Sequence, residues 1–234
     1  MRHLFFDLDR TLWDFDKNSE LALRQLFDEL GLQEQITSFD QFHEDYKQTN
    51  SLLWKEYGLG NLTKEVLRNL RFEKTLNNFN VHDPVTIQQM SDGYVEVSPR
   101  QTSLFPGAIE TLRKLQNDGY NMHIITNGFK EVQFVKLENS QLHHFFDVIL
   151  CSEDVGVNKP DERIFHYALK SANAHPHQSV MIGDDYDIDV AGAHRVGMHG
   201  IHFDPAHQFP DEDRGRIRSL TELPEILPWI LRTI

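Results

Sequence analysis

Short apolar runs alternate with longer stretches of helical periodicity along much of the chain. Five runs read as strands, at residues 3–6, 122–126, 146–151, 179–183 and 200–203. They are short and mostly apolar, which is typical of parallel strands that are covered on both faces. The stretches 106–119 and 159–173 lie between such runs and carry apolar residues at helical spacing. This alternation predicts an α/β fold with a doubly wound, Rossmann-like parallel sheet.

The segment from 17 to 100 interrupts this alternation. It has no convincing strand and four helical stretches, which we expect to start at Asn18, at Ser38, after Thr63 and at Asp83. Asn, Ser, Thr and Asp are preferred at helix N-termini, and proline, as at position 84, suits the first helical position. The pattern therefore predicts an inserted all-helical domain.

The domain boundaries follow from this interruption. We expect residues 1–16 and 101–234 to form the Rossmann-like core and residues 17–100 to form the helical domain, with hinges near 14–18 and 97–105. Residues 204–216 read as a polar surface loop, and the final stretch from 220 reads as a helix broken or capped at its prolines.

Composition narrows the expected partners and compartment. The formal net charge is −13, from 23 basic and 36 acidic residues, which argues against a nucleic-acid polymer. A small phosphate ester stays compatible, because a local cation can outweigh the overall charge. Cys151 is the single cysteine, and no apolar run approaches the roughly 20 residues that span a bilayer. We therefore expect a cytoplasmic protein without a membrane partner, while the oligomeric state stays open.

Polar clusters follow four of the predicted strands. These clusters are Asp7-Leu8-Asp9-Arg10-Thr11, Thr126-Asn127-Gly128, Asn158-Lys159-Pro160 and Gly183-Asp184-Asp185. In open parallel sheets, ligands bind beyond the carboxyl ends of the strands, so the clusters are expected along one edge. Each motif by itself is common in turns and caps. Their order, each at a strand end, is what indicates a site.

The acidic residues of these clusters suit a metal ion. Asp7 and Asp9 lie two apart on extended chain and can face one site together. With Asp184 they would repel one another strongly unless a cation were present. Ligation by carboxylate, carbonyl and water oxygens is what Mg²⁺ prefers.

The other polar residues suit phosphoryl transfer. Lys159 adds positive charge that a carboxylate and a phosphate can share, and Thr126 supplies a hydroxyl group. The backbone N–H groups of Asn127 and Gly128, where a helix is expected to open, can hold an anion. An aspartate can act as the nucleophile through an aspartyl-phosphate, while a second carboxylate transfers protons.

The motifs FFDLDRTLWDF, HIITNG, NKPDERIF and IGDDYDIDVAGA, within residues 4–193, resemble those of the haloacid dehalogenase superfamily of aspartate-nucleophile hydrolases. The resemblance implies that Asp7 is the nucleophile and a Mg²⁺ ligand. It implies that Asp9 is the general acid and base and binds the metal through its backbone carbonyl. Thr126 and Asn127 would bind the phosphoryl group, Gly128 and Thr11 would contribute to substrate binding, and Lys159 would stabilise the charge.

The last motif holds several acids. The resemblance implies that Asp184 is a direct metal ligand and that a second acid follows four or five residues later. Asp189 fits that position best, because Val190-Ala191-Gly192-Ala193 follows it in the family's frame. Asp185 and Asp187 remain alternatives for this role.

The resemblance also implies a reaction. Members that cleave carbon–halogen bonds lack an acid two residues after the nucleophile, so Asp9 favours phosphate chemistry. The helical segment matches the family's cap, which covers the site and helps to select the substrate. DLDRTLWDF together with ITNG is similar to bacterial pyrimidine 5′-nucleotidases and implies Mg²⁺-dependent hydrolysis of nucleoside 5′-monophosphates, although Arg10 departs from the residues common there.

Other functions stay open at this point. Sugar-acid phosphatases share the TNG motif, so a sugar or sugar-acid phosphate is the alternative substrate. A phosphomutase of the same superfamily is a second alternative, and a binding module without turnover, such as a response-regulator receiver, is a third. Receivers are about half this length, and a module without turnover would normally have lost Asp7 or Asp9.

Aromatic residues are candidates to stack on a base. Those of the helical segment have helical spacing, which favours core packing: Phe39, Phe42, Tyr46, Trp54, Tyr57, Phe72 and Tyr94. Trp13 and Phe15 lie nearer the expected site.

Overall fold

The computed structural model describes residues 2–208 and 215–231. The chain divides into two compact units, which we call the sheet unit (Met1–Phe15 with Thr102–Ile234) and the helical unit (Asp16–Gln101). Among the described residues, every helix is too short or too polar to traverse a lipid bilayer.

The sheet unit is built on parallel strands. Over the described residues these are β1 (His3–Phe6), β2 (Asn121–Thr126), β3 (Val148–Cys151), β4 (Ser179–Gly183), β5 (His199–Phe203) and β6 (Arg216–Ile217). Their order in the sheet is β3-β2-β1-β4-β5-β6, and every neighbouring pair is parallel. The strand order reverses between β1 and β4, which is the position where such sheets bind ligands. The predicted α/β fold with a doubly wound sheet is confirmed.

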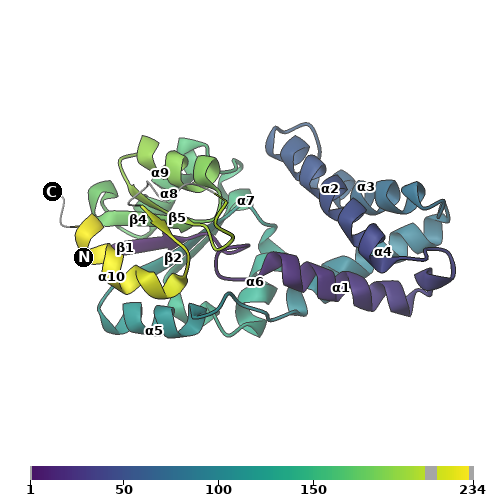
Figure 1. The fold of residues 1–234 in the computed structure, drawn as a ribbon. Coiled ribbons are helices and arrows are strands. Elements are labelled where there is room, and N and C mark those ends of the chain that lie inside the picture. The colour runs from purple at the N-terminus through teal and green to yellow at the C-terminus, as the bar shows by residue number, and fades with distance from the viewer. Residues whose placement is uncertain (1, 209–214, 232–234) are drawn as a thin grey trace. The chain divides into compact units, whose positions relative to one another are not determined.

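Helices cover both faces of this sheet (Figure 1). They are α5 (Ala108–Asn117), α6 (Lys130–Asn139), α7 (Ser152–Val155), α8 (Glu162–Ser171), α9 (Ala191–Arg195) and α10 (Leu223–Ile230). Successive strand residues point to opposite faces. Leu4 and Phe6 therefore pack in the core formed with α5, α6 and α10. Phe5 packs in the other core, with α8 and α9.

The helical unit has a core of its own. It contains α2 (Phe39–Gly58), α3 (Lys64–Asn78), α4 (Pro84–Val97) and all but the first residue of α1 (Phe15–Glu29). Three of the predicted N-caps, Ser38, Thr63 and Asp83, accept hydrogen bonds from backbone N–H groups three residues later. Most of the candidate aromatics pack in this core, as their helical spacing favours: Phe39, Phe42, Tyr46, Phe72 and Tyr94.

Two details of the predicted elements were wrong. Asn18 does not cap its helix, because α1 already begins at Phe15 and Asp16 places an acid in its first turn. Part of the expected loop 204–216 is a strand, since Arg216 pairs with His202 at the sheet edge. A two-residue strand of this kind carries no apolar pattern of its own. Residues 209–214 of that loop lie outside the described residues.

Candidate active site

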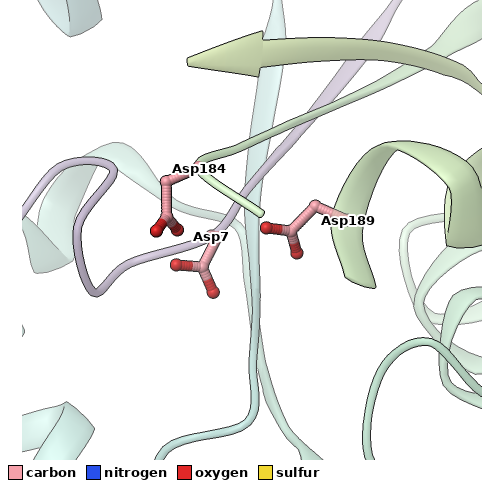
Figure 2. A group of neighbouring side chains, drawn as sticks. All are labelled: Asp7, Asp184 and Asp189. Carbon is pink, nitrogen blue, oxygen red and sulfur yellow. The ribbon is translucent and has the colours of Figure 1, made fainter. Parts of the chain in front are cut away.

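Three acids converge beyond the carboxyl ends of β1 and β4. Asp7 follows β1 directly, and its N–H donates to the carbonyl of Ile182 in β4 (2.8 Å). Asp184 follows β4, and Asp189 lies in a single π-helical turn, Tyr186–Val190. One carboxylate oxygen from each of Asp7, Asp184 and Asp189 lies within 4.8 Å of the other two. Figure 2 shows the three carboxylates turned toward one another. We call this group the acid cluster.

Lys159 joins two members of the acid cluster. Its Nζ donates to Asp7 Oδ1 (2.7 Å) and to Asp189 Oδ1 (2.6 Å), and its side chain is 2% exposed. Asn127 holds the Lys159 backbone from both sides. Its Oδ1 accepts from the Lys159 N–H (2.7 Å), and its Nδ2 donates to the Lys159 carbonyl (3.0 Å). The Asn127 side chain thus fixes the loop that carries the lysine.

Burial and mutual repulsion shape the charges in this cluster. Burial raises the pKa of Asp184 to about 7, and the Asp189 carboxylate adds to the shift. Burial also raises the pKa values of Asp7 and Asp189, although Lys159 opposes both shifts. Burial by itself would lower the pKa of Lys159, but the attraction of Asp189 and Asp7 outweighs it and the pKa is raised. Lys159 thus pairs with two of the three carboxylates, and the positive charge of Arg10 opposes the pKa shift of the third, Asp184. Three carboxylates still outnumber these two cations, so the cluster can accept a further cation.

The structure distinguishes the three candidate second acids of the last motif. Asp185 is exposed, and its Oδ1 accepts from the Ile188 N–H (3.0 Å) as the N-cap of the turn. Asp187 is exposed as well. Asp189 is 1% exposed, and its Oδ2 accepts from the Asp185 N–H (3.3 Å). Of these three, Asp189 is the acid that contacts Lys159.

Asp9 lies outside the acid cluster. Its Oδ2 accepts from Gln133 Nε2 (3.0 Å), and its Oδ1 accepts from Lys136 Nζ (2.6 Å). Its expected metal contact is through the backbone carbonyl, and that expectation stays a prediction. Thr11 is fully buried and donates to Asp184 Oδ1 (3.5 Å).

The Thr126-Asn127-Gly128 turn connects β2 to the segment before α6. The Thr126 hydroxyl accepts from the Gly128 N–H (3.1 Å). A Cβ atom at Gly128 would lie 1.8 Å from Gln133 Nε2, so glycine leaves the space that the Gln133 side chain occupies. The expected roles of these three residues in phosphoryl binding stay predictions.

Comparisons with known proteins show the family of this chain. The family model described as haloacid dehalogenase-like hydrolase matches residues 4–203. The chain belongs to this family. The resemblance seen in the sequence motifs is thereby confirmed, and the chain is an enzyme of the hydrolase class.

Several members of the haloacid dehalogenase-like family are similar over almost the whole chain. Pyrimidine 5′-nucleotidase YjjG of Escherichia coli (strain K12) is 31% identical over 228 residues, 96% of each chain. Glyceraldehyde 3-phosphate phosphatase of Methanothermobacter thermautotrophicus is 31% identical over 205 residues, 86% of this chain and 84% of that protein. The crystal structure of the HAD-hydrolase YfnB from Bacillus subtilis, bound to magnesium, has a TM-score of 0.85 at 29% identity and covers 97% of this chain and 98% of that chain.

Three residues of the site were missed by the sequence reasoning. Lys136 and Gln133 contact Asp9, and His202 Nε2 lies 2.9 Å from the Asp184 carbonyl. The sequence carries no signal for the first two, because their burial is seen only in the structure, where Gln133 and Lys136 of α6 are buried while Val135 is exposed. A helix with polar residues on its inner face indicates partners in the interior.

Trp13 does not lie where a base could stack on it. Its side chain is fully buried in the core of the sheet unit. One face of its ring lies against Lys136, with Nζ 4.1 Å from the ring centroid. The loop that carries Trp13 folds back on itself, because the Trp13 N–H donates to Leu8 and its carbonyl accepts from Arg10.

Proposed function

We propose that this chain is a magnesium-dependent phosphomonoesterase that hydrolyses nucleoside 5′-monophosphates through an aspartyl-phosphate intermediate. It is a phosphatase of the haloacid dehalogenase-like family, and the proposal concerns its metal, its intermediate and its substrate. The observation that carries the proposal is the acid cluster with Lys159 at the carboxyl ends of parallel strands. We assign the chemistry to the sheet unit and substrate selection to the helical unit, as a cap.

The donor set of the acid cluster fits Mg²⁺. Its candidate ligands are all oxygens, and three carboxylates against the two cations Lys159 and Arg10 leave excess negative charge. Asp7, Asp184 and the backbone carbonyl of Asp9 would bind the ion directly. Asp189 would add negative charge close to the ion while it accepts the hydrogen bond from Lys159. When bound there, Mg²⁺ supplies positive charge that offsets the phosphoryl oxygens. The magnesium-bound YfnB structure supports this choice of metal.

The chain's own residues then account for two steps. A carboxylate oxygen of Asp7 attacks phosphorus, forming a P–O bond as the ester P–O bond breaks, while Asp9 gives its proton to the leaving oxygen. Asp9 next takes a proton from a water molecule that attacks the aspartyl-phosphate. That step releases inorganic phosphate and restores the Asp7 carboxylate. Lys159, the Thr126 hydroxyl and the Asn127 N–H balance the phosphoryl charge.

The substrate assignment rests on the relatives. The E. coli pyrimidine 5′-nucleotidase covers almost the whole chain, and this supports a nucleotide. The similarity to the glyceraldehyde 3-phosphate phosphatase supports a small sugar phosphate as the second candidate substrate. A panel of nucleotides, sugar phosphates and sugar-acid phosphates, ranked by kcat/KM, decides between them. A preference of more than about tenfold for the sugar phosphates, about 1.4 kcal/mol of transition-state stabilisation, would overturn the nucleotide assignment.

The nucleophile and the metal are tested together. Asp7→Asn is expected to lower phosphatase turnover by at least about 1,000-fold, because amide nitrogen and oxygen are poor nucleophiles. Its thermal unfolding midpoint should stay close to that of the unaltered protein. Asp187→Asn is the matched control, since it removes an exposed acid from the turn that carries Asp189 and should keep full activity.

Chelation completes this experiment. Turnover should stop when divalent ions are removed by a chelator and should return when Mg²⁺ is added in excess. Full activity of the Asp7→Asn enzyme would contradict the nucleophile assignment. An unchanged rate in chelator would contradict the metal assignment.

A further inference from the structure

We propose that Gln133 and Lys136 of α6 are positioning residues that hold the Asp9 carboxylate for proton transfer, an inference that rests on the proposed function. Each donates to a different oxygen of the Asp9 carboxylate: Gln133 Nε2 to Oδ2 at 3.0 Å and Lys136 Nζ to Oδ1 at 2.6 Å. A carboxylate bound at both oxygens cannot rotate about its last side-chain bond without losing one of the two bonds. Its plane is therefore set by α6.

Lys136 is a buried cation whose surroundings point to Asp9. Its side chain is 4% exposed, and lysine is rarely buried to this extent without a partner. Among the described residues, Asp9 is the acid that pairs with it. The Trp13 ring lies against the same ammonium group, with the Phe15 ring centroid 5.7 Å away. The desolvation of Lys136 is thus offset by Asp9 and two aromatic faces.

Gln133 makes an independent contribution to the same carboxylate. Its side chain is 1% exposed, yet within the described part of the chain its Oε1 has no hydrogen-bond partner. A buried polar atom left unpaired costs stability, so the orientation of this amide calls for an explanation. The bond from its Nε2 to Asp9 supplies one. Gly128 leaves room for this amide, since any Cβ atom there would collide with it.

The residues that hold Asp9 lie on the helix that follows the Thr126-Asn127-Gly128 turn. Gly128 ends the Thr126-Asn127-Gly128 turn, and α6 begins two residues later at Lys130. The residues that hold Asp9 therefore follow directly from the turn expected to hold phosphate. Proton transfer depends on a heavy-atom approach within hydrogen-bond reach, and a displacement of about 1 Å can cost about 100-fold in rate.

The test uses two kinds of leaving group. The first substrate is the alkyl phosphate ester with the highest kcat/KM in the substrate panel, and its leaving oxygen needs a proton. The second is p-nitrophenyl phosphate, whose leaving group, nitrophenolate, departs as a stabilised anion. Lys136→Met and Gln133→Leu keep the side-chain size and remove the donors. Each is expected to lower kcat for the alkyl ester by about 30- to 100-fold, with KM changed less than about threefold.

With p-nitrophenyl phosphate, the two substitutions should have little effect on the first chemical step. Rapid mixing measures the initial burst of nitrophenolate, which reports Asp7 attack before the Asp9-dependent hydrolysis of the aspartyl-phosphate. The burst rate of both variants should stay within about threefold of the unaltered enzyme, because this step needs no proton. Lys136→Arg, which restores a cation, should recover part of the alkyl-ester rate.

Two further comparisons separate positioning from a loss of fold. Lys130→Met removes a surface ion pair with Asp154 from the same helix and should leave both substrates unaffected. Gly128→Ala should displace the Gln133 side chain, since the new Cβ atom would lie 1.8 Å from its Nε2 and 2.5 Å from its Cδ. It should therefore add little in a Gln133→Ala background, where those atoms are absent. Unfolding midpoints measured alongside should show that each variant is folded.

Different outcomes would overturn the positioning role and the aspartyl-phosphate mechanism. Equal losses with both leaving groups, or wild-type alkyl-ester kinetics in Lys136→Met and Gln133→Leu, would overturn the positioning role. The absence of any burst in the unaltered enzyme, together with an active Asp7→Asn variant, would instead overturn the aspartyl-phosphate mechanism on which it rests.

Discussion

At the scale of single residues, the acid cluster depends on how closely a carboxylate approaches the backbone. A Cβ atom at Gly183, the last residue of β4, would lie 2.1 Å from Asp189 Oδ2 and 2.3 Å from its Cγ. Glycine is needed here for space, because only a residue without a side chain lets Asp189 lie against the strand and reach Lys159.

Gly183→Ala is therefore expected to move Asp189 off Lys159. We expect kcat/KM to fall by at least about tenfold and the free energy of unfolding to fall by about 1–3 kcal/mol, as for an overpacked core. Phosphatase kinetics and urea unfolding measure the two effects. Gly58→Ala is the control, since nothing lies within 4 Å of its Cβ position, and it should be neutral or slightly stabilising. Wild-type kinetics for Gly183→Ala would contradict this account of the glycine.

At the scale of the elements, local side-chain chemistry decides where α2, α3 and α4 of the helical unit begin. Ser38 Oγ accepts from the Gln41 N–H (3.3 Å), and Thr63 Oγ1 accepts from the Val66 N–H (3.3 Å). Asp83 Oδ2 accepts from the Thr86 N–H (3.0 Å). Each bond satisfies a backbone donor that the helix itself leaves without a partner.

Thr63→Ala should remove the cap of α3 and lower the free energy of unfolding of the helical unit by about 1 kcal/mol. Thr63→Ser keeps a hydroxyl group that can accept the same bond and should be close to neutral. Urea unfolding followed by far-ultraviolet circular dichroism, which reports helix content, compares the two variants. Equal stability of the alanine and serine variants would show that the hydroxyl contributes nothing.

At the scale of the whole molecule, a buried histidine pair makes stability depend on pH. His3 Nδ1 and His123 Nε2 lie 3.0 Å apart and connect β1 and β2. Burial lowers the pKa of His123 from 6.5 to about 4 and also lowers the pKa of His3. The folded protein thus favours the neutral rings, whereas the unfolded chain takes up protons as the pH falls below 6.5.

The stability that His123 contributes is complete above pH 6.5 and is lost as the pH falls toward 4. Between pH 8 and pH 5 the loss should be about 2 kcal/mol, at about 1.4 kcal/mol per pH unit below 6.5. Urea unfolding of the unaltered protein and of His123→Phe across this range measures it as the difference between them. The raised pKa values of the acid cluster act in the opposite direction in both proteins and cancel from that difference. A difference that does not change with pH would contradict the prediction.

The fold was largely predictable because its signals are local. Short apolar runs identify β1, β2, β4 and β5 to within one residue, since a strand covered on both faces must be apolar throughout. The edge strand β6 was not predicted, because Arg216–Ile217 becomes a strand only by pairing with β5. The start of α1 was predicted three residues too late, at Asn18, because asparagine is a common N-cap residue.

The sequence by itself determined the fold class, the family and the order of the motifs at the strand ends. Parallel topology then placed Asp7 beside Asp184, because β1 and β4 are neighbours and their carboxyl ends share one edge. Lys159 lies eight residues after β3 and reaches them through the loop that the Asn127 side chain holds. The family frame favoured Asp189 in the sequence and left Asp185 and Asp187 as alternatives. Tertiary structure distinguished them, because Asp189 lies buried against Lys159 while the other two are exposed. It alone brought Lys136 to Asp9, 127 residues away along the chain. Contacts of that kind depend on how helices pack on the sheet, to within an ångström, and no local pattern of residues specifies such distances.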